Sequence, residues 1–241
     1  QETAVTTPTN DNTPNFTFST NEAGTITYGG SCSSSTTSAT PGNNTITLNS
    51  LSDGTYSDCT ITITNSSANS VTMSISSFVI DTTAPTVYST SPTDNQSGVS
   101  ISDNISVTFS EAMDTTSVTT NTSNTTCSGS LQLSSDNFSN CIQMSSSPSS
   151  SNSYKTFTVD PSDNLSGTTY HKIRVTTGVK DSAGNTLGSQ YETSIGFSTW
   201  SGTQQLGSSQ SDFGYGVVLD SSNNIYVAGI TAGGLDGNTS S

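Results

Sequence analysis

Short apolar runs that alternate with serine, threonine and asparagine are the feature that most constrains how this chain can fold. Examples are NFTFST, GTITYGG, NTITLNS, CTITITN and ISVTFS. A period of two places the apolar side chains on one face of an extended strand and the polar ones on the other. Such strands bury one face and expose the other to water. Because no segment has a convincing period of 3.6 residues, the sequence predicts an all-β protein built of sandwiches.

The composition fits thin-cored strands better than a disordered chain. Hydrophobic residues make up 28% of the chain and charged residues 9%, both below the average for globular proteins. Low hydrophobicity alone would indicate disorder. Here the apolar residues are gathered in the alternating runs, so we expect folded β modules with a surface of serine and threonine.

The formal net charge of −14 excludes several classes of partner. The cationic residues are Lys155, Lys172, Arg174 and Lys180, and residues 1–154 contain none. Nucleic acid is a poor partner, because lysine and arginine must displace the counterions of its backbone. An anionic membrane surface is disfavoured for the same reason. There is no run of about 18 apolar residues, so no membrane insertion is expected in this chain.

The four cysteines are expected to form two disulfides. Cys59 is in phase with the isoleucines of CTITITN, Cys32 is in phase with the apolar residues of TITYGGSC, and Cys127 and Cys141 flank a short segment. Their spacing matches no zinc pattern. We predict Cys32–Cys59 and Cys127–Cys141, although four cysteines allow three connectivities. Disulfides imply an oxidising compartment.

Residues 82–199 carry the most specific family signal. The stretch opens with DTTAPTVYSTSPTDNQSGVSISDNISVTFSEAMD and closes with TTYHKIRVTTGVKDSAGNTLGSQYETSIGFSTW. Both ends resemble the bacterial Ig-like domain of S-layer (SbsA) type. The resemblance implies an Ig-like β-sandwich on a secreted or cell-surface bacterial protein. One extra residue in TTYHKIRV, relative to the usual run of that family, predicts a β-bulge near His171 and Lys172.

Residues 14–81 are expected to form a preceding module. The phrase LNSLSDGTYSDCTITITNSSANSVTMSISSFVIDTTAP resembles the last strands of another bacterial Ig-like type. The fold class is therefore tandem Ig-like β-sandwiches. Residues 1–13 are polar and aperiodic, which predicts a linker or tail. Pro85 restricts Ala84 to extended conformations, so we expect a short, stiff link between the modules.

Residues 200–241 are similar to one SBBP-type β-propeller repeat. The matching positions include Trp200, the GYGV run and the NIYVAG run. A single repeat is a partial blade that cannot bury its face alone, so we expect the natural protein to continue beyond Ser241. Tyr215 and Tyr226 could form a sugar-stacking platform, but their alternating pattern favours a place in the blade core.

No motif indicates catalysis, and we expect no enzyme activity in this chain. A Ser/His/Asp triad would need His171, the single histidine, but this residue lies within a predicted strand. Asp160 with Asp163, and Glu111 with Asp114, are candidate carboxylate pairs. Both pairs lie in turn sequences, where such side chains usually bond the local backbone.

The sequence predicts a structural or adhesive stalk of an extracellular or surface-anchored protein, with a surface protein or a glycan as its partner. The alternative is a set of accessory glycan-binding modules of a secreted polysaccharide-degrading enzyme. Exposed aromatic residues in a row on one sheet would favour that alternative.

Calcium at the junction of the two sandwiches is a further hypothesis. The chain has 18 acidic residues, and a hard cation takes oxygen ligands. Asp81 lies in the junction, and Asp181 and Asn185 lie in the loop KDSAGN. The competing explanation is that Asp181 only braces its own turn.

Overall fold

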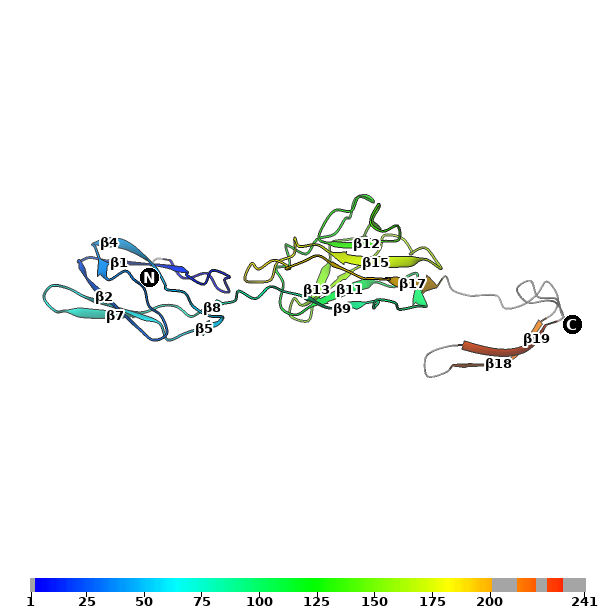
Figure 1. The fold of residues 1–241 in the computed structure, drawn as a ribbon, viewed down its shortest axis with the longest axis horizontal. Coiled ribbons are helices and arrows are strands. Elements are labelled where there is room, and N and C mark those ends of the chain that lie inside the picture. Colours follow the sequence, from blue (N-terminus) through cyan, green and yellow to red (C-terminus); the bar gives the residue numbers. More distant parts are fainter. Residues whose placement is uncertain (1–2, 201–211, 220–224, 232–241) are drawn as a thin grey trace. The chain divides into compact units, whose positions relative to one another are not determined.

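The computed structural model describes residues 3–200, 212–219 and 225–231 (Figure 1). Every regular element in these ranges is a β-strand. The chain divides into two compact units, residues 1–200 and residues 201–241. Two separate buried hydrophobic clusters lie in the first unit. We call the parts that surround them the first module (residues 3–80) and the second module (residues 87–200).

The first module contains eight strands. They are β1 (Asn15–Thr20), β2 (Gly24–Gly29), β3 (Ser38–Ala39), β4 (Gly42–Thr47), β5 (Gly54–Tyr56), β6 (Thr60–Thr64), β7 (Ser70–Ser74) and β8 (Phe78–Ile80). One sheet has the order β3-β2-β6-β7, and two strand pairs, β1-β4 and β5-β8, complete the module. Phe16, Phe18, Ile46, Ile61 and Phe78 are among its fully buried side chains.

The leading segment differs from the predicted linker. Thr3 exchanges backbone hydrogen bonds with Thr17 of β1, and the Thr9 amide donates to the carbonyl of Val79 in β8. Val5 is buried in the core of the first module. The segment thus contacts both strand pairs. Its polar sequence gave no sign of this, because one valine and backbone hydrogen bonds hold it in place.

The second module contains nine strands. They are β9 (Val87–Ser91), β10 (Val99–Ser100), β11 (Ile105–Phe109), β12 (Leu131–Ser134), β13 (Ser149–Ser151), β14 (Thr156–Val159), β15 (Tyr170–Val175), β16 (Tyr191–Glu192) and β17 (Phe197–Trp200). One sheet has the order β10-β17-β15-β12, with β16 also paired to β15, and the other has the order β13-β14-β11-β9. Alternate residues of both sheets, such as Val107, Phe157 and Ile173, are buried in one cluster, as expected for a sandwich.

Hydroxyl side chains pair across the exposed faces of both modules. Thr62 and Thr72 lie 2.7 Å apart between their hydroxyl oxygens, and Thr108 and Thr156 lie 3.0 Å apart. Such cross-strand pairs stabilise a sheet modestly. They explain how a chain so rich in threonine forms regular strands.

The predicted bulge near His171 and Lys172 is wrong. His171 is buried and Tyr170 is exposed, so β15 alternates regularly with the histidine facing the core. Its register with β12 is continuous from Leu131↔Val175 to Ser134↔Lys172.

The irregularity lies in the neighbouring segment of the chain. His171 of β15 pairs with Phe197, and Arg174 pairs with Glu192. The three residue steps from His171 to Arg174 therefore lie opposite the five steps between Phe197 and Glu192. Gly196 lies in this interval at a φ of +87°. A Cβ atom there would be 2.2 Å from the carbonyl oxygen of His171, so glycine is required.

Both disulfides have the predicted pairing. Cys32 is bonded to Cys59 in the first module, and Cys127 to Cys141 in the second. Cys32, Cys59 and Cys141 are buried. Each bond closes a loop within one module, so the bonds stabilise the modules separately.

The second unit contains one described β-hairpin. Strand β18 (Asp212–Leu219) pairs antiparallel with β19 (Ile225–Thr231), with a register shift between Gly214 and Gly216. Tyr215 and Tyr226 are exposed, which contradicts the expected core position. Among the described residues of this unit, no second layer covers either face of the two strands. Residues 220–224, between the two strands in the sequence, lie outside the described residues.

Candidate metal centre

Three carboxylates converge where the chain enters the second module. Asp81, Glu111 and Asp181 each offer a ligand atom, and these atoms all lie within 4.8 Å of one another. Asp81 directly follows β8, and Glu111 follows β11 by two residues. Asp81 and Asp181 were predicted from the sequence for this site, whereas Glu111 was a candidate for a carboxylate pair with Asp114.

Backbone pairing brings the loops of Glu111 and Asp181 together. Met113 forms an antiparallel bridge with Asp181. The Ser182 amide donates to the carbonyl of Ala112 at 3.0 Å. A further bridge between Lys180 and Thr186 closes the KDSAGN loop as a tight hairpin. The positions of the two carboxylates therefore follow from backbone geometry.

Asp181 braces its own turn, as the competing explanation proposed. Its Oδ1 accepts hydrogen bonds from the amides of Ala183, Gly184 and Asn185 at 2.7–2.9 Å. Its side chain is buried. The Oδ2 atom accepts one hydrogen bond, from the side chain of Asn185. Bracing fixes the carboxylate in place, and it leaves Oδ2 with capacity for a further partner.

Asn185 links the hairpin to the entering chain. Its Nδ2 donates to the backbone carbonyl of Asp81 and to Oδ2 of Asp181, both at 2.8 Å. Both partners are acceptors, so the amide nitrogen must face them. Asn185 thus positions the two aspartates through its side-chain nitrogen, whereas the sequence favoured a role as an oxygen ligand.

Asp81 also connects the site to the first module. Its amide donates to the carbonyl of Thr9 at 2.9 Å, and the Asn10 amide donates to the carbonyl of Ala183 at 3.1 Å. One Asp81 carboxylate oxygen accepts the Thr83 amide at 3.1 Å. The carboxylate cluster therefore lies among segments of both modules.

Glu111 has a strongly raised pKa. Its pKa is raised from 4.5 to about 7, first by desolvation and then by the nearby charges of Asp81 and Asp181. A hydrogen bond with the Asp81 side chain raises the pKa further. Among the described residues both ion pairs involve Glu192, so no lysine or arginine neutralises the cluster. A proton on Glu111 relieves this repulsion, and a divalent cation would do so more strongly.

The residues present suit a hard cation. Carboxylate and carbonyl oxygens are the ligands that Ca²⁺ takes, usually six to eight with water included. Three carboxylates supply part of that set, and water would supply the rest. In the sequence, Glu111 lies 30 residues from Asp81 and 70 from Asp181. The one feature of the sequence that pointed to Glu111 is its position as an acidic residue just after a buried strand.

Comparison with family models identifies the second module. Residues 81–199 match the model of the bacterial Ig-like domain. The second module therefore resembles a bacterial Ig-like domain and is called the Ig-like domain from here on. Residues 202–236 match the model of the β-propeller repeat. Both matches agree with the resemblances found in the sequence.

Solved structures similar to the chain include those of an S-layer protein. The crystal structure of S-layer protein rSbsC(31-844) is 18% identical, with a TM-score of 0.36, and the match covers 60% of this chain and 19% of that one. The N-terminal part of the bacterial S-layer protein SbsC is also 18% identical, with a TM-score of 0.37 and coverage of 60% and 32%. The chain thus spans less than a third of each. No curated protein matches the chain.

Residues considered for catalysis in the sequence have local partners in the structure. Oδ1 of Asp114 accepts hydrogen bonds from the amide and hydroxyl of Thr116, while Glu111 faces Asp81 and Asp181. Asp160 accepts a hydrogen bond from Ser145. His171 is buried and stacks on Phe197, with ring centroids 5.4 Å apart. These contacts agree with turn and core roles.

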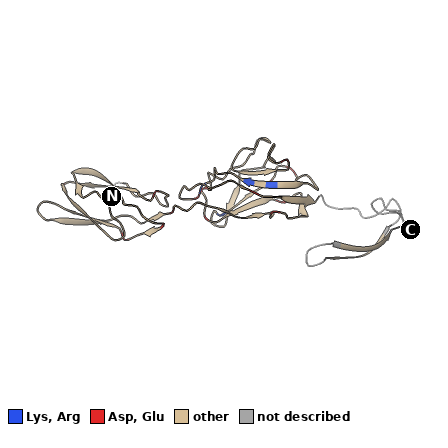
Figure 2. Cartoon of the chain, viewed as in Figure 1, with Lys and Arg blue, Asp and Glu red and all other residues tan. Residues whose placement is uncertain are grey.

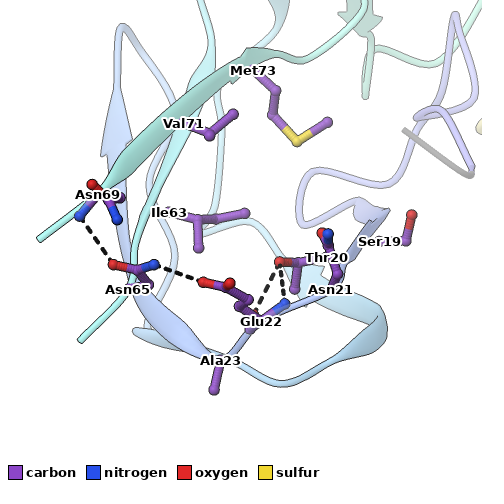
Figure 3. Close-up of a pocket in the computed structure, with 10 residues that line it drawn as sticks. All are labelled: Ser19, Thr20, Asn21, Glu22, Ala23, Ile63, Asn65, Asn69, Val71 and Met73. Carbon is purple, nitrogen blue, oxygen red and sulfur yellow. Dashed lines mark hydrogen bonds between the residues drawn. The ribbon is translucent and has the colours of Figure 1, made fainter. Parts of the chain in front are cut away.

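A hollow of about 490 Å³ lies in the first module, outside the Ig-like domain (Figure 3). Ile63, Val71 and Met73 line one side, and polar turn residues line the other. Nδ2 of Asn65 donates to Glu22 at 2.6 Å, joining the two turns. Within the ranges that the structure describes, no helix is long and apolar enough to cross a membrane.

Proposed function

We propose that this chain is a non-catalytic structural region of a secreted or surface-anchored bacterial protein, and that Ca²⁺ bound by Asp81, Glu111 and Asp181 stabilises the entry to its Ig-like domain. Two disulfides support an oxidising, extracellular location. The Ig-like family supports a role as a spacer or adhesive stalk. The net charge of −14 fits a soluble, mutually repelling surface.

The observation that carries the proposal is the convergence of three carboxylates without a neutralising lysine or arginine. In the absence of an ion this arrangement costs stability, because the charges repel and are partly desolvated. A bound Ca²⁺ turns the repulsion into attraction. It would also join the segment that follows β8 to the loops of the Ig-like domain, since each carboxylate comes from a different segment.

Thermal unfolding of the full chain tests the proposal. A ligand that binds only the folded state raises the unfolding temperature with its concentration. We expect the midpoint to rise when EDTA is replaced by millimolar Ca²⁺, and to rise less with Mg²⁺, which demands a stricter octahedral geometry. An unchanged midpoint in Ca²⁺ would remove the calcium site and leave only the spacer role.

A further inference from the structure

Two large aromatic side chains lie exposed on the outer face of one sheet of the Ig-like domain. Tyr170 begins β15 and is 59% exposed, and Trp200 ends β17 and is 40% exposed. The sequence assigned Trp200 to the propeller repeat, whereas it pairs with Ser100 of β10. Both residues alternate with buried neighbours, His171 and Thr199. They therefore point away from the core on the same face.

The strand register places these rings close together. Tyr170 pairs with Ser198, and Trp200 lies two residues beyond Ser198 on the same face. Such diagonal neighbours are about 7–8 Å apart at the backbone, within reach of aromatic side chains. The outer face of this sheet thus presents an indole and a phenol as diagonal neighbours.

Cationic side chains continue this face along β15. Lys172 and Arg174 share the parity of Tyr170, and Figure 2 shows their positions in blue on that strand. Glu192 accepts from both, at 3.4 Å and 3.0 Å. Arg174 is also held over the ring of Phe138 at 3.5 Å. Lys172 and Arg174 therefore share a single ion-pair partner, in a chain whose net charge is −14.

We propose that this face, formed by Tyr170, Lys172 and Trp200, binds an extended anionic polysaccharide. The apolar faces of sugar rings stack on aromatic side chains, because the rings offer rigid apolar area at little entropic cost. The carboxylates of an acidic glycan would meet the Lys172 ammonium. Because the net charge of the chain is −14, the cations of this face would confine a polyanion to it, and the stacking of sugar rings on Tyr170 and Trp200 distinguishes an acidic glycan from other polyanions. The inference goes beyond the proposed structural role and does not depend on the calcium site.

Fluorescence of Trp200 gives a direct assay, because it is the only tryptophan of the chain. The full chain is titrated with polygalacturonate in EDTA-containing buffer of low ionic strength, so that calcium plays no part. We expect a saturable change in emission that weakens as salt is added. Fully methyl-esterified polygalacturonate and polyglutamate serve as comparison ligands, and we expect both to bind more weakly than polygalacturonate.

Matched substitutions locate the binding face. Tyr170→Ala should weaken binding about tenfold, the effect of losing roughly 1.4 kcal/mol of aromatic contact. Lys172→Ala should weaken binding and reduce its dependence on salt. Tyr88→Ala and Lys155→Ala are the controls: Tyr88 is an exposed tyrosine on the opposite sheet, and Lys155 directly precedes β14 of that sheet. Both controls should bind as the parent does.

Three results would overturn the proposal. The first is an emission spectrum that polygalacturonate leaves unchanged. The second is equal binding of polyglutamate, which would mean that charge alone attracts the ligand. The third is an equal loss of binding in the Tyr88→Ala and Tyr170→Ala variants. Circular dichroism and the unfolding midpoint of each variant show whether it is folded, and Tyr170→Phe, which keeps the ring, should restore binding.

Discussion

Asn185 donates its side-chain amide to the backbone carbonyl of Asp81 at 2.8 Å, across 104 positions of sequence. The same nitrogen donates to Asp181 at 2.8 Å. One amide therefore fixes both the chain that enters the Ig-like domain and the hairpin that carries a buried carboxylate. Glu111 completes the cluster, and the physical behaviour of the site follows from its three carboxylates.

Substitution of Glu111 should make the calcium-free protein more stable at neutral and alkaline pH. The folded protein keeps the Glu111 proton up to about pH 7, because its pKa is raised from 4.5 to about 7. Between these values the folded state binds more protons than the unfolded state, so this residue lowers stability as pH rises. In EDTA, Glu111→Gln should raise the unfolding midpoint at pH 8 and not at pH 4. Equal shifts at both pH values would contradict the assignment.

His171 should change the stability of the fold with pH in the direction opposite to Glu111. Burial lowers its pKa from 6.5, and its buried Nε2 has no hydrogen-bond partner. The unfolded chain binds a proton more readily, so this residue destabilises the fold as pH falls below about 6.5.

The His171→Phe variant should not lose this stability on acidification, and its free energy of unfolding at neutral pH should equal that of the parent. The ring contact with Phe197 can be kept, and the carbonyl of Thr169 still accepts from Thr199. Urea unfolding at pH 5 and pH 8 measures the difference. A variant that loses as much stability on acidification as the parent would show that the histidine is not responsible.

The disulfides should contribute strongly to the free energy of unfolding, because the hydrophobic cores of the two modules are thin. Their sequence separations are 27 and 14 residues, and closing loops of this size stabilises a fold by about 3–4 kcal/mol in the loop-entropy model. The Cys127→Ser/Cys141→Ser variant should lose about 3 kcal/mol in the Ig-like domain. Non-reducing peptide mapping of the parent should yield the two pairs within modules. A peptide joining Cys59 to Cys127 would contradict them.

Hydrogen exchange should be much faster in the β18–β19 hairpin than in β11. Val217 and Val227 of the hairpin are more than half exposed, whereas Val107 of β11 is fully buried. Two strands without a covering layer are only marginally stable in water. Equal protection of Val217 and Val107 amides would show that the hairpin has a stable partner.

The sequence predicted the fold well where periodicity was the governing signal. Alternating runs such as ISVTFS became regular strands with Ile105, Val107 and Phe109 buried. The parity of Cys32 and Cys59 was enough to indicate their bond. The leading segment was missed, because Val5 is a single apolar residue in a polar stretch and backbone pairing leaves no compositional trace.

The sites were harder to predict than the strands. Asp81 and Asp181 were chosen from loop chemistry, but Glu111 joins them only because Met113 pairs with Asp181. The extra residue was assigned to β15 itself, near His171 and Lys172. The extra residues lie around Gly196 instead, and Tyr170 is exposed on the outer face.

Calcium titration by isothermal calorimetry measures whether Asp81, Glu111 and Asp181 bind a metal ion. At pH 6.5 the parent should bind one Ca²⁺ per chain, with a heat that depends on the buffer because Glu111, whose pKa is about 7, releases its proton. Binding should weaken at pH 5.5, where Glu111 is protonated. It should be lost in Glu111→Gln and kept in Asp103→Asn, which removes an exposed carboxylate outside the site. A parent that gives no binding heat, or a Glu111→Gln variant that binds as tightly as the parent, would contradict the account.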